Sequence, residues 1–542
     1  MKISILLLLY FFCISITLPA QKYTALDSLR GSYHGNRSCY DLNHYHLRLT
    51  IDPVTRFISG SNRLTSMGLT ESRTMQVDLD PAFDIDKIET SLGSAKWNRS
   101  GSSVTVTLTS KIKPGIVFWV EVFYHGHPHI AANPPWDGGF VWASDKEGFP
   151  WVGVSCEGQG ASLWFPSKDH PADEPDSAFL QYEVPKNLVA VGNGQFLGKK
   201  SVSDSTSQFS FKVSYPVNHY NITFNAGAYQ TWTDTITLAE SGSVMKMDFF
   251  ALREDLEKAK MQWKQSHKVL KVLGELFGDY PFQRDGYKLV QTPYRGMEHQ
   301  SCIAYGEKFV DNAFGFDYII MHETGHEWWG NKISANDHAD LWIHESFTTY
   351  AEALFVEKLQ GFEKSLAYLL EHKKKIKNKS NIQGERDLYF NDWKDSDMYY
   401  KGCWMLHSLR YIVNNDTLWF ASLKAIAKES GFKPISGDQL IERLGKQLKI
   451  NLVPFFAQFL NSTTWPVLEY KSEISEGKTI LSYQWNCSRK DFEYPAPIQV
   501  NGNALRLEAT SEWKNQEFSE PINSIEAVEK KFLYKIHNIK KK

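Results

Sequence analysis

The sequence predicts a multidomain α+β protein. Its parts are an amino-terminal antiparallel β domain, a mainly helical middle domain and a small carboxy-terminal β domain. The chain has 542 residues, more than one hydrophobic core usually supports. Apolar and polar residues alternate from about residue 40 to 250 and again after Thr464, as in half-buried strands. Between these stretches the apolar residues recur at helical spacing.

The first β domain is predicted from short alternating runs separated by Gly, Asn, Pro and Asp. An antiparallel sheet with one buried face produces this pattern. The clearest runs cover residues 45–51, 103–108, 117–123 and 209–213. We place the domains at 21–250, 251–462 and 463–542.

Residues 150–175 interrupt this alternation. The segment is rich in Gly and Pro, so we expect an irregular loop rather than a strand. A long loop inside a compact domain is usually functional.

The middle domain begins with a helical pattern at residues 253–277. One face of that helix would carry Leu256, Ala259, Trp263, Leu270, Leu273 and Phe277. Further helices are expected at 362–377, 400–413 and 451–460, and Ser436 with Gln439 has the form of a capping box. From Thr464 onward, runs such as 467–470, 480–483 and 497–500 return to strand spacing.

Composition limits the class of protein and its location. The formal net charge of −2 argues against a nucleic-acid-binding protein, which would carry a basic surplus. Residues 1–20 have a charged start, an apolar run and a small residue before the expected cut after Ala20, which predicts a secretory signal peptide. No later stretch is long and apolar enough to span a membrane, so we expect a secreted or periplasmic protein with no stable membrane insertion once the signal is removed. The remaining cysteines are widely spaced and are expected to be buried and unpaired.

The segment Met321 to Gly330 contains the pattern H-E-x-x-H, formed by His322, Glu323 and His326. Residues four apart lie on one face of a helix, so the two imidazoles can bind one metal ion with the Glu beside it. Gly330 and Asn331 are a plausible end for this helix. Gly325 is unfavourable inside a helix and is tolerable where another element packs closely.

A catalytic zinc takes three protein ligands, so a third is needed. Glu345 is the candidate, in a second helical segment that a short connection would place beside the first. The adjacent His344 competes on composition. Neighbouring helical residues point about a hundred degrees apart, so one of the two faces the metal, and we choose Glu345.

The spacing of His322, Glu323, His326 and Glu345 resembles the gluzincin aminopeptidases of the aminopeptidase N and leukotriene hydrolase type. The resemblance implies a thermolysin-like catalytic domain and one zinc ion per chain. Around the third ligand the family usually has Asn-Glu-Gly-Phe-Ala, and this chain has His-Glu-Ser-Phe-Thr at 344–348.

The resemblance also implies substrate-binding residues. Gly296, Met297 and Glu298 correspond to part of the family's Gly-x-Met-Glu-Asn motif, which binds the substrate's α-amine. Arg295 stands where the first Gly usually lies, and His299 replaces the Asn.

Two further residues follow from the same resemblance. Glu157, with Gln159 as the alternative, corresponds to a second contact to the amine. Tyr399, in Tyr-x-Lys-Gly at 399–402, corresponds to the donor of a hydrogen bond to the oxyanion, and the adjacent Tyr400 would then be a packing residue.

The sequence therefore predicts a zinc aminopeptidase acting on peptides with a free amino terminus, with Glu323 as general base. Three alternatives stay open: a thermolysin-like zinc endopeptidase, an epoxide hydrolase, and a catalytically dead peptide-binding scaffold. The sequence indicates neither an oligomeric state nor the preferred amino-terminal residue.

Overall fold

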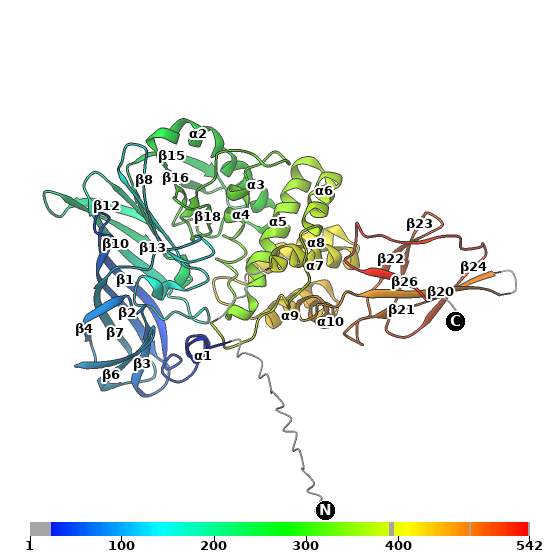
Figure 1. Ribbon diagram of the computed structural model, residues 1–542, viewed down its shortest axis with the longest axis horizontal. Coiled ribbons are helices and arrows are strands. Elements are labelled where there is room, and N and C mark those ends of the chain that lie inside the picture. Colours follow the sequence, from blue (N-terminus) through cyan, green and yellow to red (C-terminus); the bar gives the residue numbers. More distant parts are fainter. Residues whose placement is uncertain (1–22, 390–394, 476–477, 540–542) are drawn as a thin grey trace, which may run out of the picture.

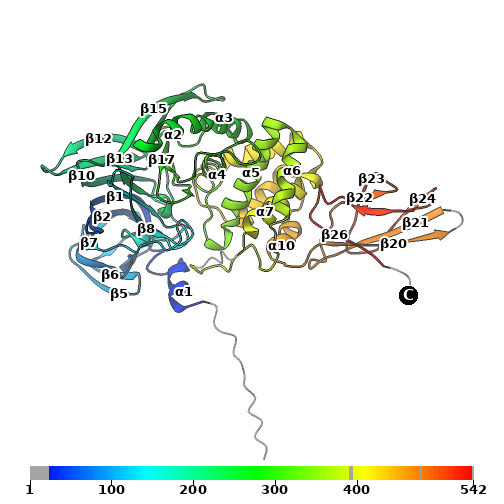
Figure 2. The same cartoon turned by 45° about the horizontal axis from the view of Figure 1, so that its top comes forward.

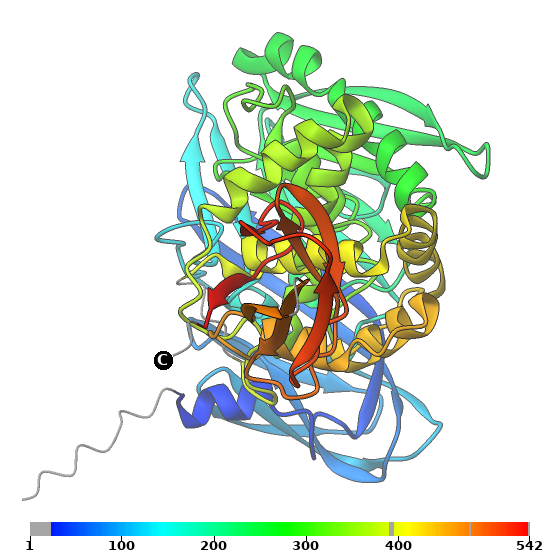
Figure 3. The same cartoon turned by 90° about the vertical axis from the view of Figure 1, so that its right-hand side faces the viewer.

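The computed structural model describes residues 23–389, 395–475 and 478–539. Figures 1 and 2 show strands of the first part, then the helices, then the carboxy-terminal strands, arranged in a row. Seen from the end, the carboxy-terminal strands lie in front of the helical part (Figure 3). The predicted order of β, mainly helical and β parts is confirmed. The predicted signal peptide, residues 1–20, lies outside the described residues.

The first part contains three sheets. The largest has the strand order β12-β13-β10-β1-β2-β7-β4. Its strands are β1 (Tyr40–Asp52), β2 (Phe57–Gly68), β4 (Phe83–Thr90), β7 (Val117–Gly126), β10 (Ser177–Pro185), β12 (Gln195–Ser201) and β13 (Thr206–Val213). The other two sheets contain β3 (Ser72–Asp78), β5 (Ala95–Ser100) and β6 (Ser103–Ile112), and β8 (Gly139–Ser144), β9 (Pro150–Ser155), β11 (Val189–Gly192) and β14 (Phe224–Gly227). The domain is not wholly antiparallel, because β1 and β10 pair in parallel.

The expectation of an irregular loop over the whole of 150–175 was wrong at its start. Residues Pro150–Ser155 form strand β9, which pairs with β8 and β14. Pro150 takes the first position of the strand, where a missing N–H is tolerated. Gly153 fits because an added Cβ would lie 2.8 Å from the Tyr294 ring.

A separate, five-stranded sheet supports the helical part. Its order is β15-β16-β17-β19-β18, with β15 (Tyr229–Thr237), β16 (Val244–Leu252), β17 (Tyr287–Gln291), β18 (Gly296–Met297) and β19 (Ile303–Tyr305). Residue 250, near which we placed the domain boundary, is therefore inside a strand of this sheet, and sheet membership changes earlier, between β14 and β15. Strand β18 is at the edge of the sheet.

The helices of the middle part are α2 (Leu256–Gln262), α3 (Gln265–Phe277), α4 (Tyr318–Gly325), α5 (Trp342–Gln360), α6 (Phe362–Lys373), α7 (Asp397–Val413), α8 (Asp416–Glu429), α9 (Gly437–Leu448) and α10 (Val453–Leu460). The single helix expected at 253–277 is divided into α2 and α3. Both the hydroxyl and the N–H of Ser266 donate to the carbonyl of Trp263, a local alternative to helical bonding. The capping box of Ser436 and Gln439 is confirmed at the start of α9.

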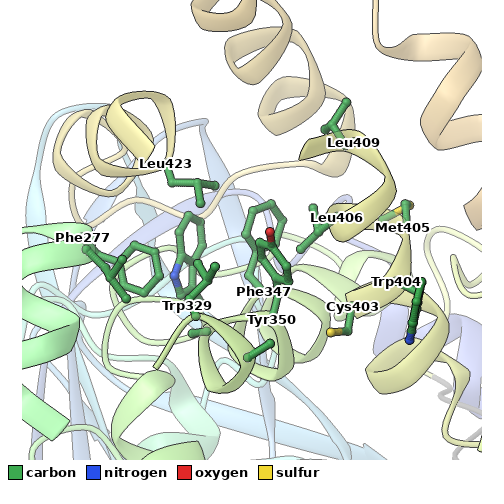
Figure 4. Packing of buried hydrophobic residues seen from close by; sticks show 14 of the residues in the cluster. Phe277, Trp329, Phe347, Tyr350, Cys403, Trp404, Met405, Leu406, Leu409 and Leu423 are labelled. Carbon is green, nitrogen blue, oxygen red and sulfur yellow. The ribbon is translucent and has the colours of Figure 1, made fainter. Parts of the chain in front are cut away.

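Aromatic packing fixes α5 against the turn that follows α4. The Trp329 ring stacks on Phe347 with centroids 4.3 Å apart, and its other neighbour is Phe277 at 5.4 Å. Figure 4 shows these rings with Leu406 and Leu409 of α7. All five side chains are buried, so the helices that carry the predicted metal ligands are held by a shared core.

Residues 23–37, which include helix α1 (Ala25–Gly31), form a segment that we call the amino-terminal clasp. The carbonyl of Asp27 accepts a hydrogen bond from the N–H of Tyr389 at 3.0 Å. The Arg30 guanidinium donates to the carbonyl of Gln159 at 2.5 Å and to Asp169 at 3.2 Å, and it lies 3.7 Å from the centroid of the Tyr389 ring. The clasp therefore joins the loop after β9 to the segment that precedes α7.

The carboxy-terminal part has two small sheets. They contain β20 (Val467–Ser475), β21 (Lys478–Asn486), β24 (Lys514–Phe518) and β26 (Lys535–Asn538), and β22 (Ala496–Val500), β23 (Asn503–Leu507) and β25 (Ile525–Ala527). Arg506 of β23 donates to the carbonyls of Tyr411 and Ile412 at the end of α7, which attaches this part to the helices.

Two further expectations concern the whole chain. The cysteines within the described residues are buried and free, as predicted. Among the helices that the structure describes, none has both the length and the apolar character needed to cross a membrane.

Candidate active site and metal centre

Helix α4 carries the first two predicted ligands. The Asp317 side chain accepts a hydrogen bond from the Ile320 N–H and caps the helix start. His322 lies inside the helix, and His326 is the C-cap residue at its end. The helix ends at Gly325, earlier than the stop expected at Gly330 and Asn331, because the Asn331 N–H donates to the His326 carbonyl at 2.9 Å and the chain leaves the helix in a wider turn.

Close packing between α4 and α5 brings in the third ligand. A Cβ added to Gly325 would lie 3.0 Å from Cγ2 of Thr348 on α5, which explains a glycine in this helix. Glu345 is in the first turn of α5. The connection between the two helices, residues 326–341, is longer than expected and includes a short 3-10 helix at His338–Asp340.

The three ligand atoms form a nearly equilateral triangle. His322 Nε2 and His326 Nε2 are 3.3 Å apart, and each is 3.6 Å from Glu345 Oε2. Tetrahedral ligands about 2.0–2.1 Å from one zinc ion lie roughly 3.3–3.4 Å from each other. Glu345 Oε2 is buried and has no hydrogen-bond partner within the described structure. The spacing and this unsatisfied oxygen fit one zinc ion.

Both imidazoles are oriented by partners on their other nitrogen. His322 Nδ1 lies 2.6 Å from Glu352 Oε1, and the second oxygen of Glu352 accepts a hydrogen bond from Tyr368. His326 Nδ1 lies 3.0 Å from the Trp329 carbonyl oxygen. A proton on each Nδ1 leaves each Nε2 lone pair directed at the metal position.

Glu352 was not singled out from the sequence. It follows Glu345 by seven residues, two helical turns, so it lies on the same face of α5. That spacing was the available signal. It does not reveal that the carboxylate would contact His322 rather than solvent.

The structure also distinguishes Glu345 from His344. His344 Nε2 accepts a hydrogen bond from the Ala335 N–H at 2.9 Å, so that nitrogen is engaged by the chain itself. Burial lowers the pKa of His344 to about 3, and the ring is neutral. It is not part of the triangle of ligand atoms.

Glu298 lies next to the metal position. Its Oε1 accepts a hydrogen bond from the Tyr220 hydroxyl at 2.9 Å, and its backbone carbonyl accepts from Asn331 Nδ2 at 2.9 Å. Carboxylate oxygens of Glu298 and Glu323 and a ring nitrogen of His326 lie within 4.8 Å of one another. No sequence pattern marks Tyr220 or Asn331 as site residues, because both reach the site through tertiary packing.

Glu157 is at the same end of the cavity. Its carboxylate lies within 4.8 Å of that of Glu298, and its Oε1 is buried without a hydrogen-bond partner in the described part of the chain. The alternative residue, Gln159, instead accepts a hydrogen bond from the Gly138 N–H at 2.7 Å. The geometry thus places Glu157, and not Gln159, where it could contact an amine.

The acidic groups of the site are crowded and buried. Burial raises the pKa of Glu323 to about 8, although His322 opposes the shift. Burial, followed by the neighbouring Glu298, raises the pKa of Glu157 well above its ordinary value. Burial also raises the pKa of Glu298, against the influence of His326. Carboxyl groups this close do not all ionise unless cations accompany them, so the arrangement favours a metal ion and a second, substrate cation.

Tyr399 and Tyr400 differ in their surroundings. The Tyr399 ring stacks beside His322 with centroids 6.2 Å apart, and burial raises its pKa well above the ordinary value, so its hydroxyl is a proton donor. The Tyr400 hydroxyl accepts a hydrogen bond from Lys375 at 3.3 Å. Within the described residues no hydrogen bond engages the Tyr399 hydroxyl, which leaves it available to a bound molecule.

All of the residues predicted for the site line one cavity of about 160 Å³. The set is His322, Glu323, His326, Glu345, Glu298, Glu157, Gly296, Met297 and Tyr399. Gly296 approaches the general base so closely that an added Cβ would lie 2.6 Å from Glu323 Oε1. The backbone of β18 therefore forms one wall of the cavity.

We predict that Glu352→Ala lowers zinc affinity by about 10- to 100-fold, because His322 loses the group that fixes its ring. Competition with a chromogenic chelator measures the affinity. Glu357→Ala is the matched control, since Glu357 lies on the same helix but pairs with Arg410, and its zinc affinity should equal that of the wild type. Equal affinities for wild type and Glu352→Ala would contradict the orienting role.

Residues 261–459 match the sequence model of the peptidase family M1 domain. Leukotriene A-4 hydrolase of Xenopus laevis is 21% identical over 434 residues, which cover 74% of this chain and 67% of that protein. Aminopeptidase B of Mus musculus is 24% identical over 400 residues, which cover 67% of this chain and 56% of that protein. The chain thus spans between about half and two thirds of these relatives.

A solved structure of an M1 zinc metallopeptidase from Deinococcus radiodurans has a TM-score of 0.66 with this fold at 22% identity, covering 79% of this chain and 94% of that one. At this identity the likeness shows a shared fold. Together with the matched domain and the His-His-Glu triangle, it supports the expected likeness to the gluzincin aminopeptidases, and the peptidase family M1 domain of this chain is the part at residues 261–459.

Proposed function

We propose that this protein is a zinc-dependent aminopeptidase that removes residues from the amino terminus of peptides. The observation that carries the proposal is the position of Glu298 and Glu157, two carboxyl groups within 4.8 Å of each other and beside the metal ligands. A cationic α-amine would neutralise this acidic end of the cavity and set the first peptide bond at the metal.

In this proposal His322, His326 and Glu345 hold the zinc ion. When bound, zinc supplies a Lewis acid that polarises the scissile carbonyl and lowers the pKa of water towards about 7. Glu323 accepts the proton of the attacking water and delivers it to the leaving amine. The Tyr399 hydroxyl donates a hydrogen bond to the oxygen that becomes negative in the transition state.

The edge of β18 contributes to substrate binding. Among the described strands, β18 has one hydrogen-bonded neighbour, β19, and both of its residues, Gly296 and Met297, line the cavity. An extended peptide could therefore align along this edge, as in other β-strand additions. In the relative from Deinococcus radiodurans, a variant has been solved bound to a Tyr-Ser-Ala substrate.

The same acidic end argues against the endopeptidase alternative. A longer substrate would place neutral backbone beside Glu298 and Glu157, where burial already disfavours their charged forms.

We further propose that the protein is exported. The support is the sequence of residues 1–20, with a charged start, an apolar run and Ala20 before the cut. Expression in a host with a secretion pathway should yield mature protein that begins at Gln21, as measured by intact mass. Retention of residues 1–20 would contradict the proposal.

We predict that blocking the substrate amine lowers kcat/KM by roughly 30-fold to several thousand-fold, because Glu298 would be left buried without its cation. The measurement compares an amino-acid anilide with its N-acetylated form. Equal cleavage of the two would exclude the exopeptidase mechanism and favour an endopeptidase.

We predict that Glu323→Gln lowers kcat by about 10²- to 10⁴-fold, since the amide cannot transfer the proton. Zinc content, measured by atomic absorption, should stay at one ion per chain because Glu323 is not a ligand. Turnover equal to that of the wild type would remove the mechanism, and absence of activity in both proteins would favour the binding-scaffold alternative.

A further inference from the structure

Arg295 occupies the position where the family motif usually has its first Gly. It lines the cavity together with four acidic residues, Glu157, Glu298, Glu323 and Glu345. Among the cavity-lining residues that the structure describes, it is the only Lys or Arg. An anionic group of a bound peptide would be repelled by the other charged walls and attracted at this one.

The Arg295 side chain is held in place, but part of its hydrogen-bond donors have no partner in the described part of the chain. Its Nε donates to Glu307 at 3.0 Å, and its guanidinium lies 5.4 Å from the centroid of the Tyr318 ring. A guanidinium has five N–H donors, and its terminal nitrogens make no hydrogen bond within the described residues. The side chain is 48% exposed and Arg295 lines the cavity, so a molecule that binds there can reach these donors.

The position of Arg295 along the substrate follows from Glu323. The next residue, Gly296, comes so close to this general base that a Cβ there would lie 2.6 Å from Glu323 Oε1. Glu323 gives its proton to the leaving amine, so the departing part of the peptide lies on this side. Glu298, the amine anchor, is three residues further along the same wall.

We propose that Arg295 is a specificity residue that binds a carboxylate on the departing part of the peptide, either the carboxy terminus of a short peptide or an acidic side chain. The proposal rests on the proposed aminopeptidase function. In this proposal Glu298 binds the substrate's ammonium at one end of the wall from 295 to 298. Arg295 binds a substrate carboxylate at the other end.

The dimensions fit short peptides. Three residue steps separate the Cα atoms of Arg295 and Glu298 by at most roughly 11 Å, which is also the length of an extended peptide of three residues. A cavity of about 160 Å³ has room for on the order of ten water-sized groups, comparable to one or two residues. A terminal carboxylate of a dipeptide or tripeptide would therefore reach the mouth, where Arg295 lies.

Four peptides that share the amino-terminal residue preferred in an anilide panel test the proposal. One pair is Xaa-Ala and Xaa-Ala-amide, which differ in the terminal carboxylate. The other pair is Xaa-Asp-amide and Xaa-Asn-amide, which differ in the side-chain carboxylate. For the wild type we expect kcat/KM about tenfold higher for the carboxylate member of at least one pair, the scale of a charge-assisted hydrogen bond at an open site. The pair that shows the preference identifies the source of the carboxylate.

In Arg295→Gln that preference should fall to a ratio near one, and Arg295→Lys should keep part of it because the charge remains without the paired N–H geometry. Arg253→Gln is the matched control: Arg253 also pairs with a glutamate, Glu147, and is not among the residues that line the cavity. It should keep the wild-type ratio.

The outcomes separate this proposal from the one it rests on. Wild-type protein that cleaves neither the anilide nor the peptides contradicts the aminopeptidase function. Wild-type protein that cleaves them without any preference for a carboxylate overturns the role of Arg295 alone. A preference that persists in Arg295→Gln overturns it as well.

Discussion

The close contact between α4 and α5 sets the geometry on which the proposed chemistry depends. Where Gly325 meets Thr348, two helices approach without an intervening side chain, and this brings Glu345 to 3.6 Å from each imidazole. A larger residue at 325 would separate the helices and enlarge the ligand triangle. The stacked rings of Trp329, which follows α4, and Phe347, on α5, also hold these two helices together. The same packing therefore stabilises the core and the metal position.

The second constraint is charge. Four glutamates line a cavity that also receives two imidazoles, and burial raises the pKa of Glu157, Glu298 and Glu323. Such a site is balanced only when cations are present. A metal ion offsets the charge at one end and a substrate ammonium at the other, so the same electrostatics that would hold zinc would also select the substrate.

The sequence predicted the parts that depend on local periodicity. His322, His326 and Glu345 could be found because a helix places fixed spacings on one face, and the alternating runs in β1, β6, β7 and β13 were recognisable for the same reason. Strand β9 was missed because its Gly and Pro are tolerated by its neighbours in space, which a linear pattern does not contain.

Contacts between segments that are distant in the chain could not be predicted from the sequence. Tyr220 and Asn331 reach Glu298 from a 3-10 segment and a turn, and nothing in their own surroundings marks them. The choice between Glu157 and Gln159 likewise needed the hydrogen bond from the Gly138 N–H, which engages the amide. For Arg295 the sequence showed a departure from a motif, but only the structure gave the side of the cavity on which it lies.

The amino-terminal clasp has a consequence for the order of assembly during synthesis. Residues 23–37 are synthesised before their partner Tyr389, which follows hundreds of residues later in the chain. A nascent chain can already contain His322, His326 and Glu345 before Tyr389 has been synthesised. At that stage the amino-terminal clasp can contact the loop that bears Glu157 but not the segment that precedes α7. The contacts of the amino-terminal clasp, residues 23–37, are therefore complete only after the segment just ahead of α7 has been synthesised.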